Sequence, residues 1–256
     1  MSSLLTPDVC VVGGGSAGLV VAAGAAQLGL EVVLVERALM GGDCLNFGCV
    51  PSKALIAAAR AAQAQRSGAA FGIAPVEPAI DFGKVMDHVV GVIAAIAPND
   101  SVERFEKLGV RVLPEEARFV GRTELQAGPH RIRSKRIVLA TGSRPALPPV
   151  PGLTDVPHFT NETIFANRVL PSHLVVLGGG PIGLEMAQAF RRLGSKVTVL
   201  EAATCLAKDD PELAAIVVAR LRGEGVALHE RTRATRVERT ADGIAAVLDS
   251  GARIEG

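Results

Sequence analysis

The sequence predicts an α/β protein in which one supersecondary unit occurs twice. Residues 9–36 align with residues 174–201 without a gap, and four glycines, a Leu-Gly pair and a final glutamate coincide in the two segments. Each segment begins with a continuous apolar run, which is typical of parallel strands covered on both faces. The repeat therefore indicates two domains of the same class, and 256 residues suffice for two hydrophobic cores.

Each copy predicts a strand, a tight turn, a helix and a second strand. The strands are expected at 9–12 and 32–35 in the first copy, and at 174–177 and 197–200 in the second. The helices are expected at about 17–28 and 182–193. A glycine suited to a helix C-cap follows each of them, at Gly29 and Gly194.

Segments outside the repeat predict further elements. Helices are expected at about 53–65, 82–97 and 101–108, the second with Asp81 as its N-cap. Small antiparallel strands are expected at 110–113, 117–120, 124–126 and 130–133, and an apolar strand at 137–140. The proline-rich run 145–152 cannot continue a helix or a central strand, so we expect a hinge between domains there. The tail from residue 226 predicts short strands separated by turns.

The glycines of each repeat predict a nucleotide-binding fingerprint. The first copy has Gly13, Gly15, Gly18 and the acidic residue Glu36, and the second copy repeats the set as Gly178, Gly180, Gly183 and Glu201. In such a fingerprint the first glycine permits a tight turn, the second lets the backbone approach a pyrophosphate, and the third lets the helix pack on the strand. The acidic residue accepts hydrogen bonds from ribose hydroxyls. The sequence thus predicts two Rossmann-like dinucleotide-binding domains of three layers.

Glu201 favours NAD over NADP as the cofactor of the second domain. A carboxylate at that strand end suits a free 2′-hydroxyl and repels a 2′-phosphate. Residues 202–204 supply no cation that would offset this repulsion.

Composition excludes several classes of partner. The net charge is +1, and aromatic residues make up 3% of the chain, with no Trp or Tyr. We therefore expect neither a nucleic acid nor an acidic membrane as a partner. The uncharged stretch 9–30 is better interpreted as a buried strand and helix than as a membrane span, because it contains a glycine cluster. Four cysteines in a chain of this length favour a cytoplasmic protein over a secreted disulfide scaffold.

Two of the four cysteines, Cys44 and Cys49, form a closely spaced pair in the run 41–53. This run follows the first fingerprint, so the pair suggests a dithiol held beside a bound dinucleotide. Cys10 lies in an apolar run and is expected to be a small buried hydrophobe, and Cys205 is isolated and expected to be a spectator. Zinc would need two further ligands at suitable spacing, so no metal site is predicted.

Together these features resemble the flavoprotein disulfide reductases, the class I pyridine nucleotide-disulfide oxidoreductases. The resemblance is carried by the two fingerprints, by the run G-G-x-C-x-N-x-G-C-x-P-S-K at 41–53, and by the A-T-G-x-x-P segment at 140–145. It implies an FAD-binding domain over 1–148 and an incomplete NAD(P)-binding domain over 149–256.

The resemblance also implies roles for single residues. Electrons would pass from the nicotinamide to the flavin, then to a Cys44–Cys49 disulfide, and then by thiol exchange to the substrate. Cys49 would face the flavin and Cys44 would meet the substrate. Lys53, near the flavin ring, would form a buried ion pair with Glu185. Besides the two fingerprints, the implied cofactor contacts are Gly42, Asp43, Lys53, Ala117, Thr141 and Gly142 for FAD, and Ala234 for the nicotinamide cofactor.

Several functions stay open from the sequence. The first is an FAD-dependent dithiol–disulfide oxidoreductase most like dihydrolipoyl dehydrogenase, acting on a small-molecule or lipoyl disulfide. The second is a mercuric reductase-like enzyme acting on Hg(II), which the segment 159–163 also resembles. From other classes come a non-catalytic flavin- or nucleotide-binding module and an NADH oxidase with structural cysteines.

The sequence departs from the family pattern in places. Asp43 stands where the family often has Thr, and Pro181 stands where some members have a Tyr. The family pattern also continues beyond Gly256, through the rest of the nicotinamide domain to a dimerisation domain that supplies a His–Glu pair. We therefore expect an N-terminal fragment that lacks the dimerisation domain and is inactive alone, and a homodimer for the full-length protein.

Overall fold

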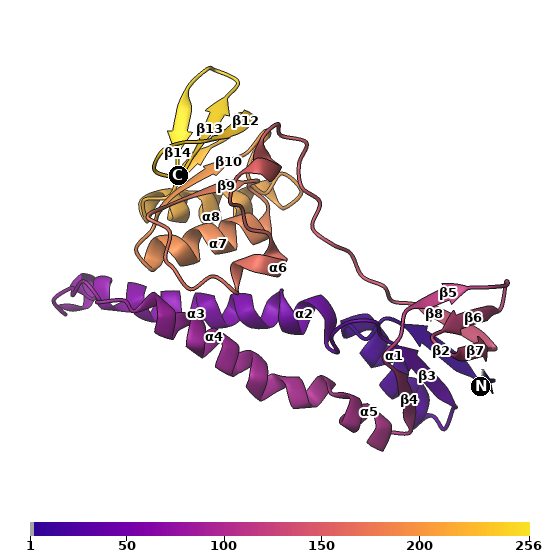
Figure 1. Cartoon of the computed structure of the whole chain (residues 1–256). Helices are drawn as coiled ribbons and strands as arrows, with labels where there is room; N and C mark the ends of the chain where they lie inside the picture. The colour runs from indigo at the N-terminus through magenta and orange to yellow at the C-terminus, as the bar shows by residue number, and fades with distance from the viewer. Residues whose placement is uncertain (1–2) are drawn as a thin grey trace. The chain divides into compact units, whose positions relative to one another are not determined.

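A computed structural model describes residues 3–256, and its contacts divide the chain into two compact units (Figure 1). The first unit contains the chain up to Pro51 and Val90–Pro145, and the second contains Ser52–Val89 and Ala146–Gly256. The predicted boundary at 148 lies close to this division. Residues 52–89, however, group with the second unit, because helices in that segment pack on it. The assignment of one cofactor to each domain stays a prediction.

The first unit is built on a parallel sheet with the strand order β4-β3-β2-β8. The strands are β2 (Val9–Val12), β3 (Val32–Val35), β4 (Val110–Leu113) and β8 (Arg136–Leu139). The bounds of β2 and β3 agree with the prediction. β4 was expected in a small antiparallel sheet, and this is wrong: it pairs with β3 in parallel. The reason is that α5 (Val102–Lys107) precedes β4 and acts as a crossover helix.

This sheet is the middle layer of three. On one face lie α1 (Ser16–Gln27) and α5, whose side chains form a buried core with β2, β3 and β4. On the other face lies a second sheet with the order β1-β7-β6-β5. Its strands are β1 (Ser3–Leu5), β5 (Ala117–Phe119), β6 (Glu124–Ala127) and β7 (His130–Arg133). β5, β6 and β7 are antiparallel as predicted, whereas β1 was not predicted and pairs with β7 in parallel.

Two long helices and one short helix lie between β3 and α5 in the chain. The short helix is α2 (Gly42–Asn46), and it was not predicted. The long helices are α3 (Cys49–Arg66) and α4 (Phe82–Ile96), both expected within a few residues of these bounds. Asp81 caps α4 as predicted, since its carboxylate accepts the backbone N–H of Lys84 at 3.1 Å. Short 3₁₀ turns occur at Ala69–Phe71, Ala97–Asp100 and Leu153–Asp155.

The second unit repeats the architecture with fewer strands. β9 (His173–Leu177), β10 (Lys196–Leu200) and β11 (Ala227–His229) form a parallel sheet with the order β11-β10-β9. Figure 1 shows α7 (Pro181–Arg192) and α8 (Pro211–Gly223) on one side of it. An antiparallel sheet packs on the other side through Leu200, Ala246 and Leu248. Its strands are β12 (Ala234–Arg239), β13 (Ile244–Leu248) and β14 (Arg253–Glu255), as the tail predicted. The helices α6 (Asn161–Ile164) and α8 were not predicted.

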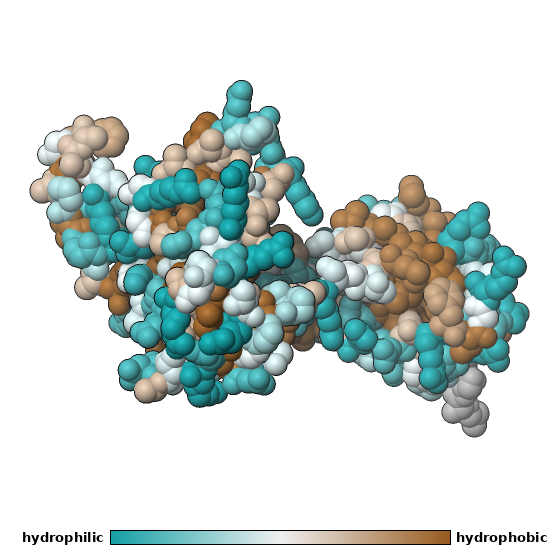
Figure 2. Space-filling view, turned by 90° about the horizontal axis from the view of Figure 1, so that it is seen from above, coloured by the Kyte–Doolittle hydropathy of each residue, from teal (hydrophilic) through white to brown (hydrophobic). Residues whose placement is uncertain are grey.

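The segment between β8 and the 3₁₀ turn at Leu153 is irregular. Residues 140–150 form neither helix nor strand, as the prolines predict. None of the helices within residues 3–256 is long and apolar enough to cross a membrane. Apolar side chains do gather on part of the surface of the first unit, which Figure 2 shows on the right. Exposed apolar residues of this unit include Val20, Leu28 and Leu139, so its apolar side chains are not confined to the cores.

Candidate active site

The first fingerprint forms a tight turn between β2 and α1. Gly13 has a φ of 110°, and a Cβ atom there would lie 2.2 Å from the carbonyl oxygen of Ala140. A Cβ atom at Gly18 would lie 1.8 Å from the carbonyl oxygen of Gly13. Both positions therefore require glycine, because any side chain would separate the helix from the strand or the turn from β8.

The cysteine-bearing run lies directly on this turn. The backbone N–H of Gly41 donates to the carbonyl oxygen of Gly14 at 2.8 Å. Gly42 has a φ of 56°, and a Cβ atom there would lie 2.7 Å from the Cα of Gly15. The start of α2 thus packs backbone against backbone on the N-terminus of α1, which leaves no room for a side chain at the contact.

The cysteines follow within a few residues of that contact. Cys44 lies in α2 and is half-buried, and Cys49 is the first residue of α3 and is exposed. The loop is held by Asn46, whose side-chain amide donates to the carbonyl oxygens of Met40 at 3.1 Å and Gly42 at 2.8 Å. Within residues 3–256 the structure contains no disulfide, and the Cys44–Cys49 disulfide stays a prediction.

Asp43 is exposed and belongs to the same loop. Its carbonyl oxygen accepts the backbone N–H of Phe47 at 2.8 Å. A Cβ atom at Gly48 would lie 2.8 Å from its carboxylate, so Gly48 is needed for this packing. The predicted contact of Asp43 and Gly42 with a cofactor stays a prediction.

Glu36 contacts the fingerprint itself, which the sequence did not reveal. Its carboxylate accepts the backbone N–H groups of Gly14 at 2.6 Å and Ala38 at 2.7 Å. The residue therefore ties the turn to the end of β3. Each carboxylate oxygen keeps acceptor capacity, so a ribose hydroxyl can still bind as predicted.

The second unit repeats this turn in detail. A Cβ atom at Gly183 would lie 2.2 Å from the carbonyl oxygen of Gly178, whose φ is 115°. Glu201 accepts the backbone N–H groups of Gly179 at 2.7 Å and Ala203 at 2.8 Å. Gly180 is the N-cap of α7, and Pro181 opens the helix. The two fingerprints are therefore equivalent in geometry as well as in sequence.

The equivalence of the two repeats extends beyond the aligned segments to a sulfur-containing side chain, which is Met40 in the first repeat and Cys205 in the second. A Cβ atom at Gly14 would lie 3.0 Å from the Sδ of Met40, and one at Gly179 would lie 2.6 Å from the Sγ of Cys205. Cys205 is buried, and burial, with Glu230 and Glu201 nearby, raises the pKa of its thiol to about 11. The thiol is thus unreactive, as expected for a spectator, but it packs on the second fingerprint. Extending the alignment past residue 201 would have indicated this position.

Cys10 is buried in β2, as expected. Burial raises the pKa of its thiol to about 11. Only the thiolate is nucleophilic, so Cys10 does not compete with the pair in the cysteine run.

Lys53 and Glu185 form the ion pair that the sequence predicted. The ammonium of Lys53, in α3, lies 2.8 Å and 2.7 Å from the carboxylate oxygens of Glu185, in α7. The predicted burial of the pair is wrong, because the side chains remain 60% and 38% exposed. They meet across the surface of the second unit rather than inside it.

The remaining predicted residues lie at strand ends. Thr141 and Gly142 follow the carboxyl end of β8, and the backbone of Thr141 lies next to Gly13. Carboxyl ends of parallel strands are the usual ligand site of such sheets. Ala117 opens β5 and packs against the core below the sheet. In the second unit, Ala234 opens β12 at a shift in strand register.

Comparison with known proteins gives one consistent answer. The family model described as "Pyridine nucleotide-disulphide oxidoreductase" matches residues 7–256. Mercuric reductase of Streptomyces lividans is 36% identical over 94% of this chain and 52% of its own length. Mercuric reductase of Serratia marcescens is 35% identical over 90% of this chain and 52% of its own length. The chain spans about half the length of these curated relatives.

A similar solved structure is the HOCl-induced flavoprotein disulfide reductase RclA from Escherichia coli. It has a TM-score of 0.82 at 28% identity, and the match covers 97% of this chain and 54% of that chain. A Cu(II) complex of the same protein matches with a TM-score of 0.82 at 27% identity, over 96% and 54% of the two chains.

Proposed function

We propose, since this chain belongs to the pyridine nucleotide-disulphide oxidoreductase family, that it carries the electron-transfer site of an NAD(P)-dependent flavoprotein dithiol–disulfide oxidoreductase. One observation carries the proposal. The backbone of the cysteine run packs on the first fingerprint, through Gly41 on Gly14 and Gly42 on Gly15. A dithiol is thereby held a few residues from a turn built to receive a dinucleotide.

The second glycine of each fingerprint supports the two cofactor sites. Gly15 and Gly180 have ordinary φ values of −88° and −76°, so their backbones do not require glycine. A Cβ atom at Gly180 would meet no described protein atom within 4 Å, and one at Gly15 would meet only Gly42, at 3.7 Å. Protein packing therefore does not explain these glycines. Close approach of a ligand to the N-termini of α1 and α7 does, and helix N-termini favour phosphate groups.

The residues of the first unit fit FAD. Gly13, Gly15 and the N-terminus of α1 would hold its pyrophosphate, and Glu36 would accept its ribose hydroxyls. Thr141 and Gly142, at the carboxyl end of β8, would complete the site. Bound FAD supplies two-electron transfer between a nicotinamide and a thiol pair.

The residues of the second unit fit NAD(H). Gly178, Gly180, Gly183 and the N-terminus of α7 would hold the pyrophosphate. The hydrogen bonds from Gly179 and Ala203 fix the carboxylate of Glu201 at the end of β10, where it would accept a 2′-hydroxyl and repel a 2′-phosphate. We therefore propose NAD rather than NADP. Ala234 would lie beside this cofactor.

Cys44 and Cys49 would pass two electrons to the substrate by thiol exchange. The thiolate of Cys44 attacks a substrate disulfide, forms a mixed disulfide and releases one substrate thiol. The thiolate of Cys49 then attacks the sulfur of Cys44, forms the Cys44–Cys49 disulfide and releases the second substrate thiol. Lys53, one turn after Cys49 in α3, would supply a cation that favours the reduced, anionic flavin.

Two classes of substrate suit the proposed dithiol. A dithiol can reduce a small-molecule or lipoyl disulfide, and thiolates also bind soft metal ions such as Hg(II). The cysteine motif prompted the dihydrolipoyl dehydrogenase-like assignment. The names of the curated relatives motivate a mercuric reductase-like alternative.

Anaerobic reduction of the flavin-loaded protein with NADH tests the proposal. We expect long-wavelength absorbance from a thiolate beside the flavin, lost in Cys49→Ser and retained in Cys10→Ala, which removes a buried thiol from the same unit. A protein that binds flavin but never shows this absorbance, with Cys49→Ser silent, would instead be a binding module. Oxygen consumption that survives loss of both Cys44 and Cys49 would indicate an NADH oxidase. Turnover with lipoamide and with Hg(II) separates the substrates.

A further inference from the structure

A second contact joins α3 and α7, far along α3 from Lys53. The guanidinium of Arg66, the last residue of α3, donates to the carbonyl oxygen of Arg192, the last residue of α7, at 2.7 Å. That carbonyl is one of the four at a helix C-terminus that have no partner within the helix. Lys53 and Arg66 are about 20 Å apart along α3 at the helical rise of 1.5 Å per residue.

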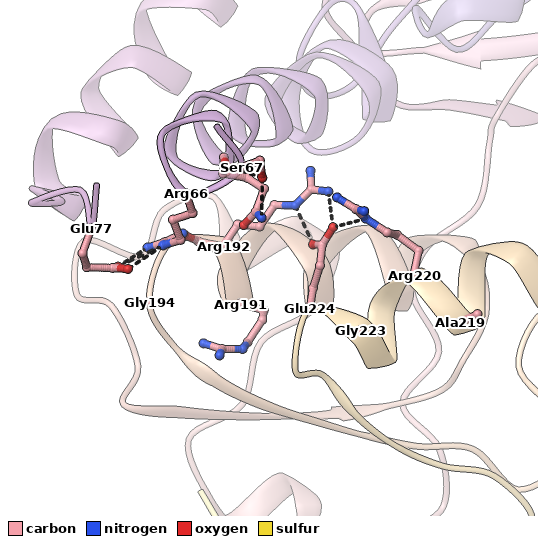
Figure 3. Close-up of a pocket in the computed structure, with 11 residues that line it drawn as sticks. Arg66, Ser67, Glu77, Arg191, Arg192, Gly194, Ala219, Arg220, Gly223 and Glu224 are labelled. Carbon is pink, nitrogen blue, oxygen red and sulfur yellow. Dashed lines mark hydrogen bonds and ion pairs between the residues drawn. The ribbon is translucent and has the colours of Figure 1, made fainter. Parts of the chain in front are cut away.

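Arg66 and Arg192 are both fixed by carboxylates, which Figure 3 shows. Arg66 holds Glu77 with two nitrogens, the Nε lying 2.9 Å from the carboxylate. Arg192 holds Glu224 with two hydrogen bonds of 2.7 Å, and Arg220 adds a third at 2.6 Å. We call these five residues the arginine network.

Glu224 is the centre of the arginine network. Its side chain is only 6% exposed, and that of Arg192 is 14% exposed. Burial alone would raise the pKa of Glu224, but the hydrogen bonds from Arg192 and Arg220 hold it below its ordinary value. A buried bidentate pair of this kind has a defined geometry, because the planar guanidinium fits the carboxylate in one orientation.

The arginine network lines a cavity of about 660 Å³ in the second unit. Arg191 lines the same cavity from α7, and Figure 3 shows its guanidinium directed away from the network. No ion pair of Arg191 is present among residues 3–256. Arg191 therefore has the same charge as Arg66 and lines the same cavity, without the hydrogen bonds and ion pair of Arg66, and it provides a matched control.

The ion pair of Lys53 and Glu185 cannot fix its own geometry. An exposed pair contributes about 0–1 kcal/mol, which does not restrain two helices. Better-buried contacts hold the α3–α4 segment in the second unit. Leu55 and Ala59 of α3 are fully buried, the rings of Phe82 and Phe190 lie 5.7 Å apart, and Arg66 donates to the carbonyl oxygen of Arg192. These contacts together determine where Lys53 lies relative to Glu185, and the hydrogen bond from Arg66 holds the last turn of α3 on α7.

We propose that Arg66 is a positioning residue: through the arginine network it anchors α3 on α7 and so holds the ammonium of Lys53 on the carboxylate of Glu185. The inference rests on the proposed function, in which the cation at Lys53 favours reduced flavin. It assigns a role to a residue that lies outside both fingerprints and outside the cysteine run.

The flavin midpoint potential of the full protein tests this role. In Arg66→Ala we expect a more negative potential, because Lys53 no longer stabilises the reduced anion as well. Arg66→Lys keeps the cation and should recover part of the shift. Arg191→Ala removes the same charge from the same cavity and should leave the potential unchanged. Equal shifts in Arg66→Ala and Arg191→Ala would overturn the proposal, because they would reflect charge alone.

A double-mutant cycle identifies the path of the effect. If Arg66 acts through the ion pair, Arg66→Ala causes no further shift in a Glu185→Gln background. A shift of the same size in both backgrounds would overturn the proposal.

Hydrogen–deuterium exchange separates this inference from the proposed function. Exchange at residues 53–66 should be faster in Arg66→Ala than in the wild type, and unchanged in Arg191→Ala. A wild type without bound flavin would contradict the proposed function, while faster exchange in Arg66→Ala alone would still support the anchoring. Unchanged exchange in Arg66→Ala would overturn the anchoring whether or not flavin binds.

Discussion

The backbone N–H of Gly41 donates to the carbonyl oxygen of Gly14 at 2.8 Å, which joins the cysteine-bearing segment to the turn of the first fingerprint. The contact continues at Gly42, which lies against the Cα of Gly15 in a conformation with positive φ. The position of the thiols relative to the turn thus depends on main-chain packing. Substitutions at these glycines are the most direct test of it.

Gly42→Ala should loosen the cysteine run. A Cβ atom would lie 2.7 Å from the Cα of Gly15, and alanine at a φ of 56° adds backbone strain. We expect a loss of about 1–3 kcal/mol in the free energy of unfolding of the first unit and a lower flavin content. Thermal unfolding and flavin absorbance measure both.

The control is Gly24→Ala in α1, where a Cβ atom meets nothing within 4 Å. It should stabilise the helix by about 0.5–1 kcal/mol, and a loss as large as that of Gly42→Ala would contradict the packing argument.

Glu201→Ala should weaken both the turn and cofactor binding in the second unit. It leaves the N–H groups of Gly179 and Ala203 without their acceptor. Hydrogen bonds to a charged group contribute about 1.5–3 kcal/mol each, so the dissociation constant of NADH should rise at least tenfold. Titration of NADH by fluorescence measures it. Glu212→Gln changes an exposed residue at the start of α8 in the same unit, so it is the control and should leave the constant unchanged.

At position 206 a glycine variant should be more stable than an alanine variant, which is the reverse of the usual order of stability. The φ of Leu206 is 55°, and Gly41, with a φ of 85°, holds the corresponding place in the first repeat. Both Leu206→Gly and Leu206→Ala remove the half-buried side chain, but only alanine keeps the strain of the left-handed conformation. The glycine variant should be more stable by about 1 kcal/mol. Chemical denaturation of the two variants checks this, and a more stable alanine variant would show that the strain is absent.

Glu224→Gln should make the second unit less stable at neutral pH and less sensitive to acid. The pKa of Glu224 is lowered in the folded state from its ordinary value of 4.5. Its carboxylate therefore contributes stability that is present above pH 4.5 and is lost as the pH falls through the lower, folded pKa. Removing one partner of a buried pair costs about 3–5 kcal/mol, because Arg192 is left uncompensated.

Unfolding curves at pH 7 and at pH 3 test this prediction. The difference between wild type and Glu224→Gln should shrink at the lower pH, since the wild-type carboxylate is then becoming protonated. A difference that is the same at both pH values would show that the pKa of Glu224 is not lowered in the folded state.

Hydrophobic pattern and glycine spacing predicted the parts of the fold that are local. The bounds of β2 and β3 follow from continuous apolar runs, and both fingerprints have the turn geometry that their glycines predict. The pairing of β4 with β3 could not be predicted, because the sequence of a four-residue strand does not indicate which neighbouring strand it pairs with. The helix α2 was missed because it depends on positive φ at Gly41 and on the side chain of Asn46, not on a periodic apolar face.

In the candidate site, too, local features could be predicted from the sequence and features that depend on packing could not. Spacing located Cys44 and Cys49, and the resemblance to the family implied the ion pair of Lys53 and Glu185. It could not show that the pair is exposed, since exposure depends on how α3 packs along its length. The second role of Glu36 and Glu201, as acceptors for their own turns, depends on backbone groups that no side-chain pattern encodes.

The equivalence of Met40 with Cys205, and of Gly41 with Leu206, has a historical consequence. Duplication of one ancestral module would produce two turns that agree up to this point, and the two segments then diverge. One leads into the thiol-bearing α2 and the other toward α8. The two copies therefore differ in the segment that follows each turn, between β3 and β4 in one and between β10 and β11 in the other, while the turn itself is the same in both.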